Sequence, residues 1–434
     1  NLLKKTPSSM EFFFHMKISE LYKIFIAHPN ITTDTRNIKE NSIFIALKGT
    51  RFNGNQYAEK ALKNGCKYAI IDDKDYQRNS KYILVKDSLE CLQNLAKYHR
   101  KKITIPIIAI TGTNGKTTSK ELISCTLASK FKTAATQGNL NNHIGVPLTV
   151  LTITKKHEIA IIEMGANHEK EISFLCEIAQ PNYGIITNIG KAHLEGFKNL
   201  EGIKRAKKEL YDYIYNNNGK IFINQDDLIL NKISENINSI SYGRSGEING
   251  SIKNRFPYLS VLYNDIEITT KLIGNYQFYN VMLAICIAKY FNVGLKDIKL
   301  EISKYKPDNN RSQIIETSSN TLILDAYNAN PSSMKEMLES FNLMRNKNKI
   351  CILGDMGELG EFSKKEHLKI VELIKKFKIK TFFIGKEFMN IENVNTYFNI
   401  DEFKKYLDKN PIKKSTILVK GSRSMTLERL TAKL

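Results

Sequence analysis

Short runs of apolar residues recur along the chain and alternate with segments of helical periodicity. The run at 105–110 is rich in β-branched residues and carries no charge, as expected for a strand buried on both faces. A helix is predicted at 116–129, and further apolar runs at 159–162 and 183–187 are separated by helical stretches. This alternation is typical of a parallel sheet built from βαβ units.

The residues before this central block predict a small α/β unit. Strand-like runs at 43–47 and 68–71 enclose a helical pattern at 57–65, which ends at Gly65. A helical stretch from about 89 to 101 leads into the central block. Met16 begins the well-patterned part of the chain, so residues 1–15 are set aside as an upstream extension.

After Pro307 the same alternation returns and predicts a Rossmann-like, doubly wound domain. Its strands are expected at 321–324, 349–353, 381–384 and 415–419, and its helices at 331–345, 363–378 and 401–408. Just before it, short alternating segments at 248–272 predict an antiparallel appendage, and a helix is expected at 278–291.

Charge and cysteine content narrow the function classes. The net charge is +21, but the lysines are spread along the chain without an RGG tract or aromatic–basic interleaving. We therefore expect a solvated surface that attracts acidic substrates rather than a nucleic-acid partner. The six cysteines lie at least 25 residues apart, as in a protein with reduced thiols in the cytoplasm. No run approaches the roughly 18 apolar residues of a membrane helix.

The strongest chemical motif lies between the strand at 105–110 and the helix at 116–129. Gly112 and Gly115 allow the backbone to approach phosphate oxygens, and Lys116 can reach the β- and γ-phosphates. Successive N–H groups and the helix N-terminus complete an anion site, and the Thr117 hydroxyl suits Mg²⁺. The predicted ATP-binding residues here are Gly112, Thr113, Asn114, Gly115, Lys116, Thr117 and Thr118.

Two further strand ends carry candidate metal ligands. Glu163 follows the apolar run at 159–162, and His193 lies shortly after the run at 183–187. Ligands in parallel sheets bind beyond the carboxyl ends of the strands, so these side chains are expected beside the phosphate turn. Each residue alone could be an ordinary loop residue, but together they favour a Mg²⁺ site.

The phosphate turn departs from the usual P-loop, because Ile110 stands where the first glycine would be. The shorter G-x-x-G-K-T resembles the nucleotide loop of the Mur ligase and folylpolyglutamate synthetase superfamily. Segments at 138–147, 163–166, 325–331 and 353–360 resemble Mur ligases specifically, and the resemblance extends over nearly the whole chain from Met16.

The resemblance implies three domains of an α/β protein. Residues 16–100 would bind the UDP-linked substrate, 101–307 would form the central ATP-binding domain with the antiparallel appendage, and 308–434 would bind the incoming dipeptide. It also implies that Lys207 is carbamylated and holds a second Mg²⁺, with Thr117, Glu163 and His193 as the other metal ligands.

Further site residues follow from the same resemblance. ATP contacts are implied for Asn280, Arg311, Asp325, Tyr327, Asn328 and Asn330. Substrate contacts are implied for Thr33, Asp34, Thr35, Arg36, Lys48, Gly49, Asn53, Asn139, Asn142, Lys420, Ser422 and Arg423. The catalytic set would be Lys116, His193, Lys207 and Arg311.

The implied activity is an ATP-driven amide ligation in peptidoglycan synthesis. A peptide carboxylate of UDP-N-acetylmuramoyl-tripeptide would become an acyl phosphate, which the amine of D-alanyl-D-alanine would attack. The expected partners are these small molecules and ATP, and the expected form is a monomer. Two alternatives stay open: another amide ligase of the superfamily, of the tripeptide or folylpolyglutamate synthetase type, and a basic NTPase stimulated by nucleic acid.

Overall fold

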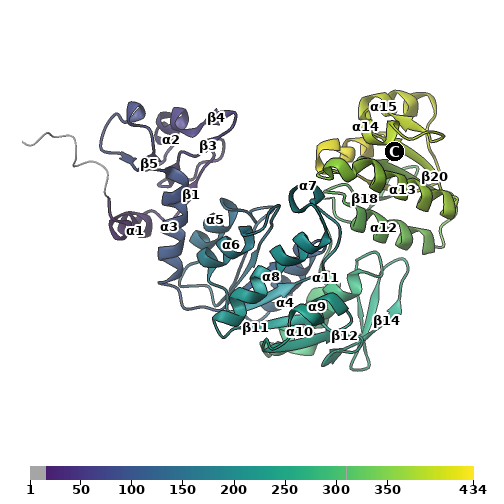
Figure 1. Cartoon of the computed structure of the whole chain (residues 1–434), viewed down its shortest axis with the longest axis horizontal. Helices are drawn as coiled ribbons and strands as arrows, with labels where there is room; N and C mark the ends of the chain where they lie inside the picture. The colour runs from purple at the N-terminus through teal and green to yellow at the C-terminus, as the bar shows by residue number, and fades with distance from the viewer. Residues whose placement is uncertain (1–15, 309) are drawn as a thin grey trace, which may run out of the picture. The chain divides into compact units, whose positions relative to one another are not determined.

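A computed structural model describes residues 16–308 and 310–434 (Figure 1). The segment 1–15, which the sequence sets aside as an upstream extension, lies outside the described residues. The chain divides into two compact units. The first contains the residues up to Ala109, Lys132–Met164 and Ser173–Asn182, and the second contains Ile110–Phe131, Gly165–Ile172 and Tyr183–Leu434.

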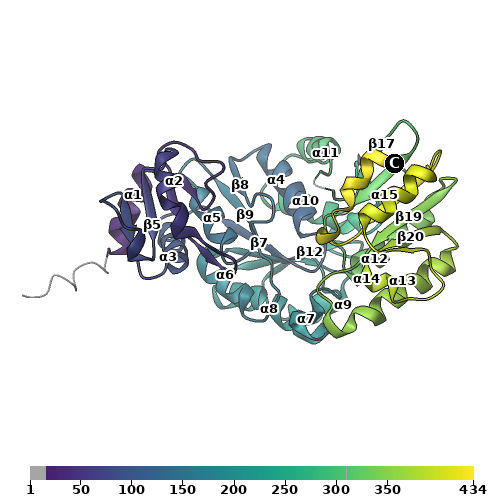
Figure 2. The same ribbon diagram turned by 90° about the horizontal axis from the view of Figure 1, so that it is seen from above.

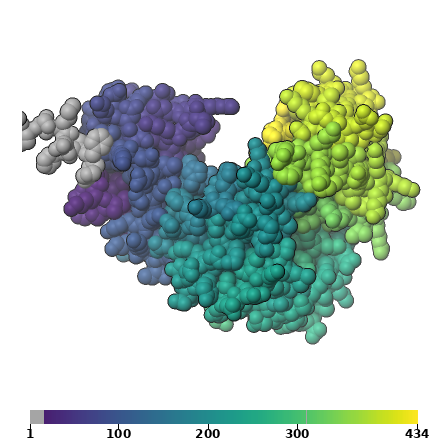
Figure 3. All heavy atoms as spheres, in the orientation of Figure 1, coloured from purple at the N-terminus to yellow at the C-terminus, as the bar shows by residue number. Residues whose placement is uncertain are grey.

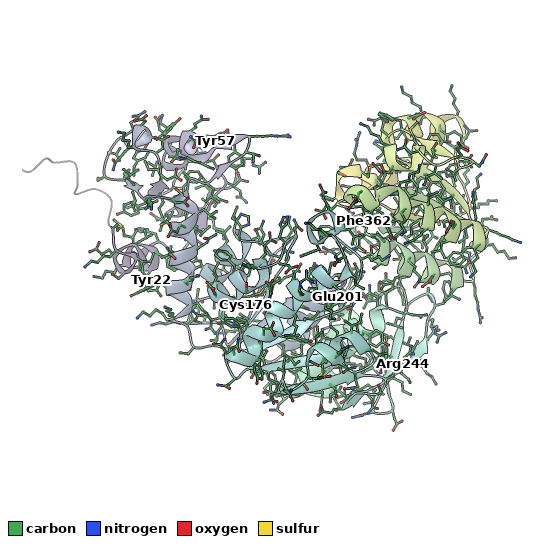
Figure 4. All side chains as sticks on the ribbon, viewed as in Figure 1. Tyr22, Tyr57, Cys176, Glu201, Arg244 and Phe362 are labelled. Carbon is green, nitrogen blue, oxygen red and sulfur yellow. The ribbon has the colours of Figure 1, made fainter. Side chains whose placement is uncertain are left out.

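The N-terminal part of the first unit is built on a four-stranded parallel sheet. The strand order is β1-β2-β5-β6. These strands are β1 (Ile31–Thr32), β2 (Ile43–Ile45), β5 (Tyr68–Ile71) and β6 (Tyr82–Leu84), and the helices are α1 (Ile18–Ala27), α2 (Ala58–Lys63) and α3 (Ser88–Arg100). Tyr22 of α1, labelled in Figure 4, shares a hydrogen bond of 3.1 Å with His99 of α3. The strands and helices expected here are confirmed, with bounds shifted by a few residues.

A seven-stranded sheet has the order β13-β12-β11-β10-β7-β9-β8. Its strands are β7 (Ile107–Thr111), β8 (Thr133–Ala135), β9 (Ile159–Glu163), β10 (Tyr183–Ile186), β11 (Lys220–Asn224), β12 (Ser239–Gly243) and β13 (Ile248–Asn249). Associated helices include α4 (Lys116–Ala128), α5 (Gly145–Thr152), α6 (Glu171–Ala179), α7 (Leu194–Phe197), α8 (Leu200–Asn216), α9 (Leu228–Ile233), α10 (Gln277–Tyr290) and α11 (Leu295–Lys304). All residues of β7 and β9 are buried, as their apolar sequences predict.

The antiparallel appendage is confirmed with one correction. Strands β14 (Ser251–Asn254), β15 (Ser260–Tyr263) and β16 (Ile266–Thr269) form a three-stranded antiparallel sheet. Assigning residues 248 and 249 to the appendage was wrong, because they form β13, which pairs in parallel with β12. A two-residue strand has no periodicity from which its partner could be predicted.

The C-terminal part of the second unit contains a six-stranded sheet of order β17-β18-β22-β19-β20-β21. Its strands are β17 (Gln313–Glu316), β18 (Thr321–Asp325), β19 (Lys349–Gly354), β20 (Lys380–Ile384), β21 (Thr396–Tyr397) and β22 (Thr416–Lys420). The long helices are α12 (Pro331–Leu343), α13 (Ser363–Phe377) and α15 (Ile400–Lys409), and α12 packs beside α13 (Figure 2). In Figure 3 these residues, coloured green to yellow, form a densely packed body.

The expected doubly wound domain is thus confirmed, with β17 and β21 as unpredicted strands at the two edges of the sheet. β17 pairs antiparallel to β18, whereas the other strand pairs of this sheet are parallel. Leu322, Ile352 and Ile417 belong to a buried cluster that includes Ile400 and Phe403 of α15. In the part of the chain that the structure describes, no helix is long and apolar enough to cross a bilayer.

Candidate active site

The glycine turn connects β7 to α4 with two residues in the left-handed region of φ. Gly112 has φ of +146° and Gly115 has φ of +78°. A Cβ atom on Gly112 would lie 1.8 Å from Oγ1 of Thr187, and one on Gly115 would lie 2.7 Å from Oδ1 of Asn280. Both positions therefore require glycine, for backbone conformation and for space.

The loop after β10 holds this turn in place through hydrogen bonds to the backbone of the turn. The amide N–H of Thr113 donates to the carbonyl of Asn188 (3.0 Å), and that of Asn114 donates to Oδ1 of Asn188 (3.0 Å). The Asn114 carbonyl accepts from Oγ1 of Thr187 (2.7 Å) and from Nδ2 of Asn188 (3.0 Å). The sequence analysis missed Thr187 and Asn188 as site residues, although polar residues directly after a parallel strand are a usable signal.

Lys116 is the first residue of α4, and its ammonium lies over the turn. Its Nζ donates to the carbonyl of Gly112 (2.7 Å) and to that of Thr113 (3.2 Å). The side chains of Thr117 and Thr118 are buried at the start of the helix. A cation, a helix N-terminus and a left-handed glycine turn together form an anion-binding concavity suited to phosphate.

Lys207 lies on α8 with only 3% of its surface exposed. Burial holds the pKa of Lys207 well below its usual value, and the positive charge of Lys116 lowers this pKa further. The neighbouring Lys208 is exposed and pairs with Asp212 instead. Lys207 therefore carries an amine that loses its proton more readily than an ordinary lysine does.

His193 precedes the short helix α7 and has φ of +50°. Its Nδ1 lies 2.5 Å from Oε2 of Glu358, and the hydrogen bond from His193 is the largest cause that lowers the pKa of Glu358. Glu358 belongs to the 353–360 segment, yet the sequence analysis gave it no role. The turn that follows it, Gly360–Phe362, packs against α7, and Figure 4 labels Phe362.

Other side chains from after residue 308 also contact the loops around the phosphate turn. Nδ2 of Asn330 donates to Oδ1 of Asn114 (2.9 Å). Lys191 pairs with the buried Glu366 (3.0 Å), and its backbone N–H donates to the hydroxyl of Ser332 (2.8 Å). The structure thus brings Asn330 to the turn, and adds Lys191 and Glu366, which no sequence pattern marks.

Arg311 and Asp325 lie near one another in the second unit. The guanidinium carbon of Arg311 is 3.7 Å from the ring centroid of Tyr327, and that of Arg423 is 5.8 Å from the same ring. Asp325 ends β18 and accepts a hydrogen bond of 2.5 Å from Nζ of Lys420, which is only 2% exposed. In this structure Lys420 contacts Asp325, whereas Arg423 is exposed and pairs with Glu428 at 3.3 Å.

The remaining candidates of this part lie close to these groups. Nζ of Lys420 also lies 3.4 Å from the carbonyl of Asn328, which is exposed. Ser422 is buried and shares a hydrogen bond of 3.2 Å with Ser424. Asn280 belongs to α10, before this part of the chain, and lies beside Gly115 of the phosphate turn. Its Oδ1 accepts a hydrogen bond of 2.9 Å from the hydroxyl of Ser119.

In the first unit, Glu163 ends β9 and is 2% exposed. Its Oε1 accepts a hydrogen bond of 2.8 Å from Nδ2 of Asn141, and its N–H donates to Oγ1 of Thr136 (3.0 Å). Asn139 and Asn142 are exposed in the segment before α5. Oδ1 of Asn142 accepts a hydrogen bond of 2.9 Å from the N–H of Gly145, the first residue of this helix.

The N-terminal candidates form two polar turns. Thr33, Asp34 and Thr35 are half-buried, and Arg36 is exposed and contacts Asp34 at 2.6 Å. The hydrogen bond from Arg36 lowers the pKa of Asp34 to about 2.

Lys48 and Gly49 form the short strand β3 (Lys48–Gly49), which pairs with β4 (Phe52–Asn53). Lys48 also pairs with Asp72 at 3.0 Å. Oδ1 of Asn53 accepts a hydrogen bond of 2.8 Å from Nδ2 of Asn55.

The donor chemistry of the candidate metal ligands suits magnesium. Among residues 16–308 and 310–434, no three His, Cys, Asp or Glu side chains gather in a group able to hold a metal ion. Mg²⁺ in phosphate sites, however, takes one or two carboxylates and completes its shell with water and phosphate oxygens. A hydroxyl, as at Thr117, and a carboxylate, as at Glu163, are oxygen donors of the kind that Mg²⁺ takes.

A left-handed glycine turn between a buried strand and a helix, with a lysine at its end, defines a nucleotide-binding α/β protein with a phosphate loop. Three family models match the chain in succession. They are "Mur ligase family, catalytic domain" at 29–100, "Mur ligase middle domain" at 110–288 and "Mur ligase, glutamate ligase domain" at 310–423.

Individual relatives agree with these matches over nearly the full length. The chain is 32% identical to the UDP-N-acetylmuramoyl-tripeptide–D-alanyl-D-alanine ligase of Bacillus subtilis, over 96% of this chain and 97% of that protein. It superposes on MurF from Acinetobacter baumannii with a TM-score of 0.83 at 29% identity, over 93% of each chain. It superposes on the MurF ligase of Thermotoga maritima in complex with ADP with a TM-score of 0.80 at 27% identity, over 93% of this chain and 96% of that chain. The chain belongs to the Mur ligase family.

Proposed function

We propose that this protein is the ATP-dependent ligase that joins D-alanyl-D-alanine to UDP-N-acetylmuramoyl-tripeptide in peptidoglycan synthesis. The observation that carries the proposal is the 32% sequence identity, over 96% of this chain, to a ligase of that name, combined with a phosphate turn at 111–116. Ligation proceeds through an acyl phosphate, which the amine of the dipeptide attacks with release of phosphate.

The chemistry requires a peptide carboxylate to approach the triphosphate, which is itself an anion. Lys116 and Arg311 offset this repulsion, Lys116 from the phosphate turn and Arg311 from the start of the C-terminal part. Arg311 suits this task because a planar guanidinium binds phosphate through two hydrogen bonds. Asp325, Tyr327, Asn328, Asn330 and Asn280 complete the proposed nucleotide site.

Magnesium, two ions in our proposal, supplies charge neutralisation at the phosphates. Thr117, Glu163 and His193 would hold it, together with Lys207 as a carbamate. Reaction of the Lys207 amine with CO₂ needs its neutral form, and the lowered pKa of Lys207 favours that form. Addition of CO₂ to the neutral amine forms an N–C bond and releases one proton, and the carbamate that results is an anion that can ligate a metal.

We propose that three parts of the chain bind the UDP end of the substrate, ATP with the muramoyl peptide, and D-alanyl-D-alanine, as the family resemblance implies. Residues 16–100 bind the UDP end through Thr33–Arg36 and the Lys48–Asn53 turn, and 101–307 bind ATP and, through Asn139 and Asn142, the muramoyl peptide. Residues 308–434 bind D-alanyl-D-alanine through Lys420, Ser422 and Arg423. The partners are small molecules only, the protein acts as a monomer, and ATP as a substrate places the reaction in the cytoplasm.

A panel of acceptor amines tests this proposal against other ligases of the superfamily. Phosphate release is measured with ATP, Mg²⁺ and UDP-N-acetylmuramoyl-tripeptide, adding D-alanyl-D-alanine, meso-diaminopimelate, lysine or glutamate. We expect release only with D-alanyl-D-alanine, and a product heavier than the tripeptide substrate by one dipeptide less water. Release with another amine instead would identify a different ligase, and release driven by DNA or RNA would favour the basic NTPase.

A further inference from the structure

Ser312 lies at the start of the C-terminal part of the chain, between α11 and β17. It is 4% exposed and has φ of +50°, a left-handed conformation that is uncommon for residues other than glycine. Such conformations persist only where the surrounding contacts over-determine them. The contacts of Ser312 therefore show what holds the segment between α11 and β17 in place.

One side of Ser312 faces Asp325. The N–H of Ser312 donates to Oδ1 of Asp325 (3.0 Å), and the hydroxyl donates to the same oxygen (3.3 Å). Because the hydroxyl proton points to Asp325, the Ser312 oxygen is left to accept a hydrogen bond. Tyr276 supplies it, since the two hydroxyl oxygens are 3.1 Å apart and burial raises the pKa of Tyr276, which keeps its proton.

On its other side, Tyr276 is linked to the helix that carries the phosphate turn. The side chain of the next residue, Gln277, also contacts the Tyr276 hydroxyl. Nδ2 of Asn280 donates to Oε1 of Gln277 (2.7 Å), and the hydroxyl of Ser119 on α4 donates to Oδ1 of Asn280 (2.9 Å). A Cβ atom on Gly115 would clash with this same Oδ1 atom of Asn280, at a distance of 2.7 Å.

Hydrogen bonds thus link α4 to Gln277, and Tyr276 to the end of β18, and Tyr276 and Gln277 are consecutive residues of the backbone. Asp325, at the end of β18, also accepts from Lys420. Ser312 is adjacent in sequence to Arg311, whose guanidinium stacks on Tyr327. Fixing Ser312 therefore fixes both Arg311 and Asp325 relative to the phosphate turn.

We propose that Tyr276 and Ser312 are positioning residues, whose shared hydrogen bond holds Arg311 and Asp325 in register with the phosphate turn. The role rests on the proposed function, because Arg311 and Asp325 are taken to contact ATP. Neither Tyr276 nor Ser312 contacts the nucleotide in this account.

Removing either hydroxyl tests the proposal through kinetics. Tyr276→Phe and Ser312→Ala should each lower kcat about tenfold, because small displacements of charged groups reduce rates strongly. The double variant should lose little more than Ser312→Ala alone, since the contact that Tyr276→Phe removes is already absent once the Ser312 hydroxyl is gone. The KM for the UDP-linked substrate should stay within about twofold, because its proposed contacts lie elsewhere.

Two further variants separate this role from a loss of stability. Ser312→Gly relieves the left-handed strain but removes the hydroxyl, and it should lower kcat as Ser312→Ala does. Tyr279→Phe is the matched control on α10, because its hydroxyl bonds to Asp226 instead, and it should keep wild-type kcat. Values of kcat within twofold of wild type for Tyr276→Phe and Ser312→Gly, or additive losses in the double variant, would overturn the proposal.

Amide hydrogen exchange tests the positioning role without the ligation reaction, because it needs only a bound ATP analogue. A non-hydrolysable ATP analogue should slow amide exchange at 311–316 in the wild type, and this slowing should be lost in Tyr276→Phe. A bound analogue that leaves exchange at 311–316 unchanged in the wild type would overturn the positioning role. Slowed exchange without ligation to D-alanyl-D-alanine would instead contradict the proposed function and support the positioning role.

Discussion

Replacing Lys116 by alanine is expected to lower ATP-dependent phosphate release by on the order of 10³-fold. The ammonium of Lys116 lies over the phosphate turn, 2.7 Å from the Gly112 carbonyl, where it can turn to the phosphates when nucleotide binds. Its loss leaves the negative charge that develops at the γ-phosphate without its nearest cation. The measurement is kcat with saturating substrates, together with the thermal unfolding midpoint.

Lys130→Ala provides the matched control, because Lys130 is exposed just after the same helix and donates to the carbonyls of Phe291 and Asn292. We expect wild-type turnover for this control and an unfolding midpoint close to wild type for Lys116→Ala. Near-normal turnover of Lys116→Ala would remove the phosphate-turn assignment.

The second large effect is expected for Lys207→Ala, with a loss of about 10–100-fold in turnover. If Lys207 acts as a carbamate, the variant lacks oxygen ligands for the second metal ion. Short-chain carboxylic acids such as acetate should then restore part of the activity, because they can occupy the vacated space with a carboxylate. Wild-type turnover should also fall when bicarbonate and CO₂ are removed.

Lys208→Ala controls for the loss of one lysine from α8. Lys208 is exposed and pairs with Asp212, so its replacement should leave turnover unchanged, with or without acetate. Wild-type turnover of Lys207→Ala, or a loss that no carboxylic acid restores, would argue against the carbamate.

The phosphate turn could be predicted from sequence because its signals are local. A strand buried on both faces, two glycines with positive φ and a helix start all lie within 107–128, and the predicted helix at 116–129 ends one residue beyond α4. The edge strand β17 could not be predicted from sequence, because it is half-buried and nothing in its own residues indicates its antiparallel pairing with β18.

The partners of the site residues were the least predictable part. Asn188, Glu358 and Glu366 lie far along the chain from the groups they contact, and only the fold brings them there. The burial of Lys420 could not be predicted from sequence either, since a lysine at a strand end is usually solvated. The family resemblance implied Lys207, but only the structure adds the burial that lowers its pKa.

The central claim is that the short glycine turn ending at Lys116 binds the phosphates of ATP. A crystal structure of the protein with a non-hydrolysable ATP analogue and Mg²⁺ tests it most directly. The account predicts phosphate oxygens within hydrogen-bonding distance of the backbone N–H groups of this turn and of Nζ of Lys116. Nucleotide bound elsewhere, or no binding at millimolar analogue, would contradict it.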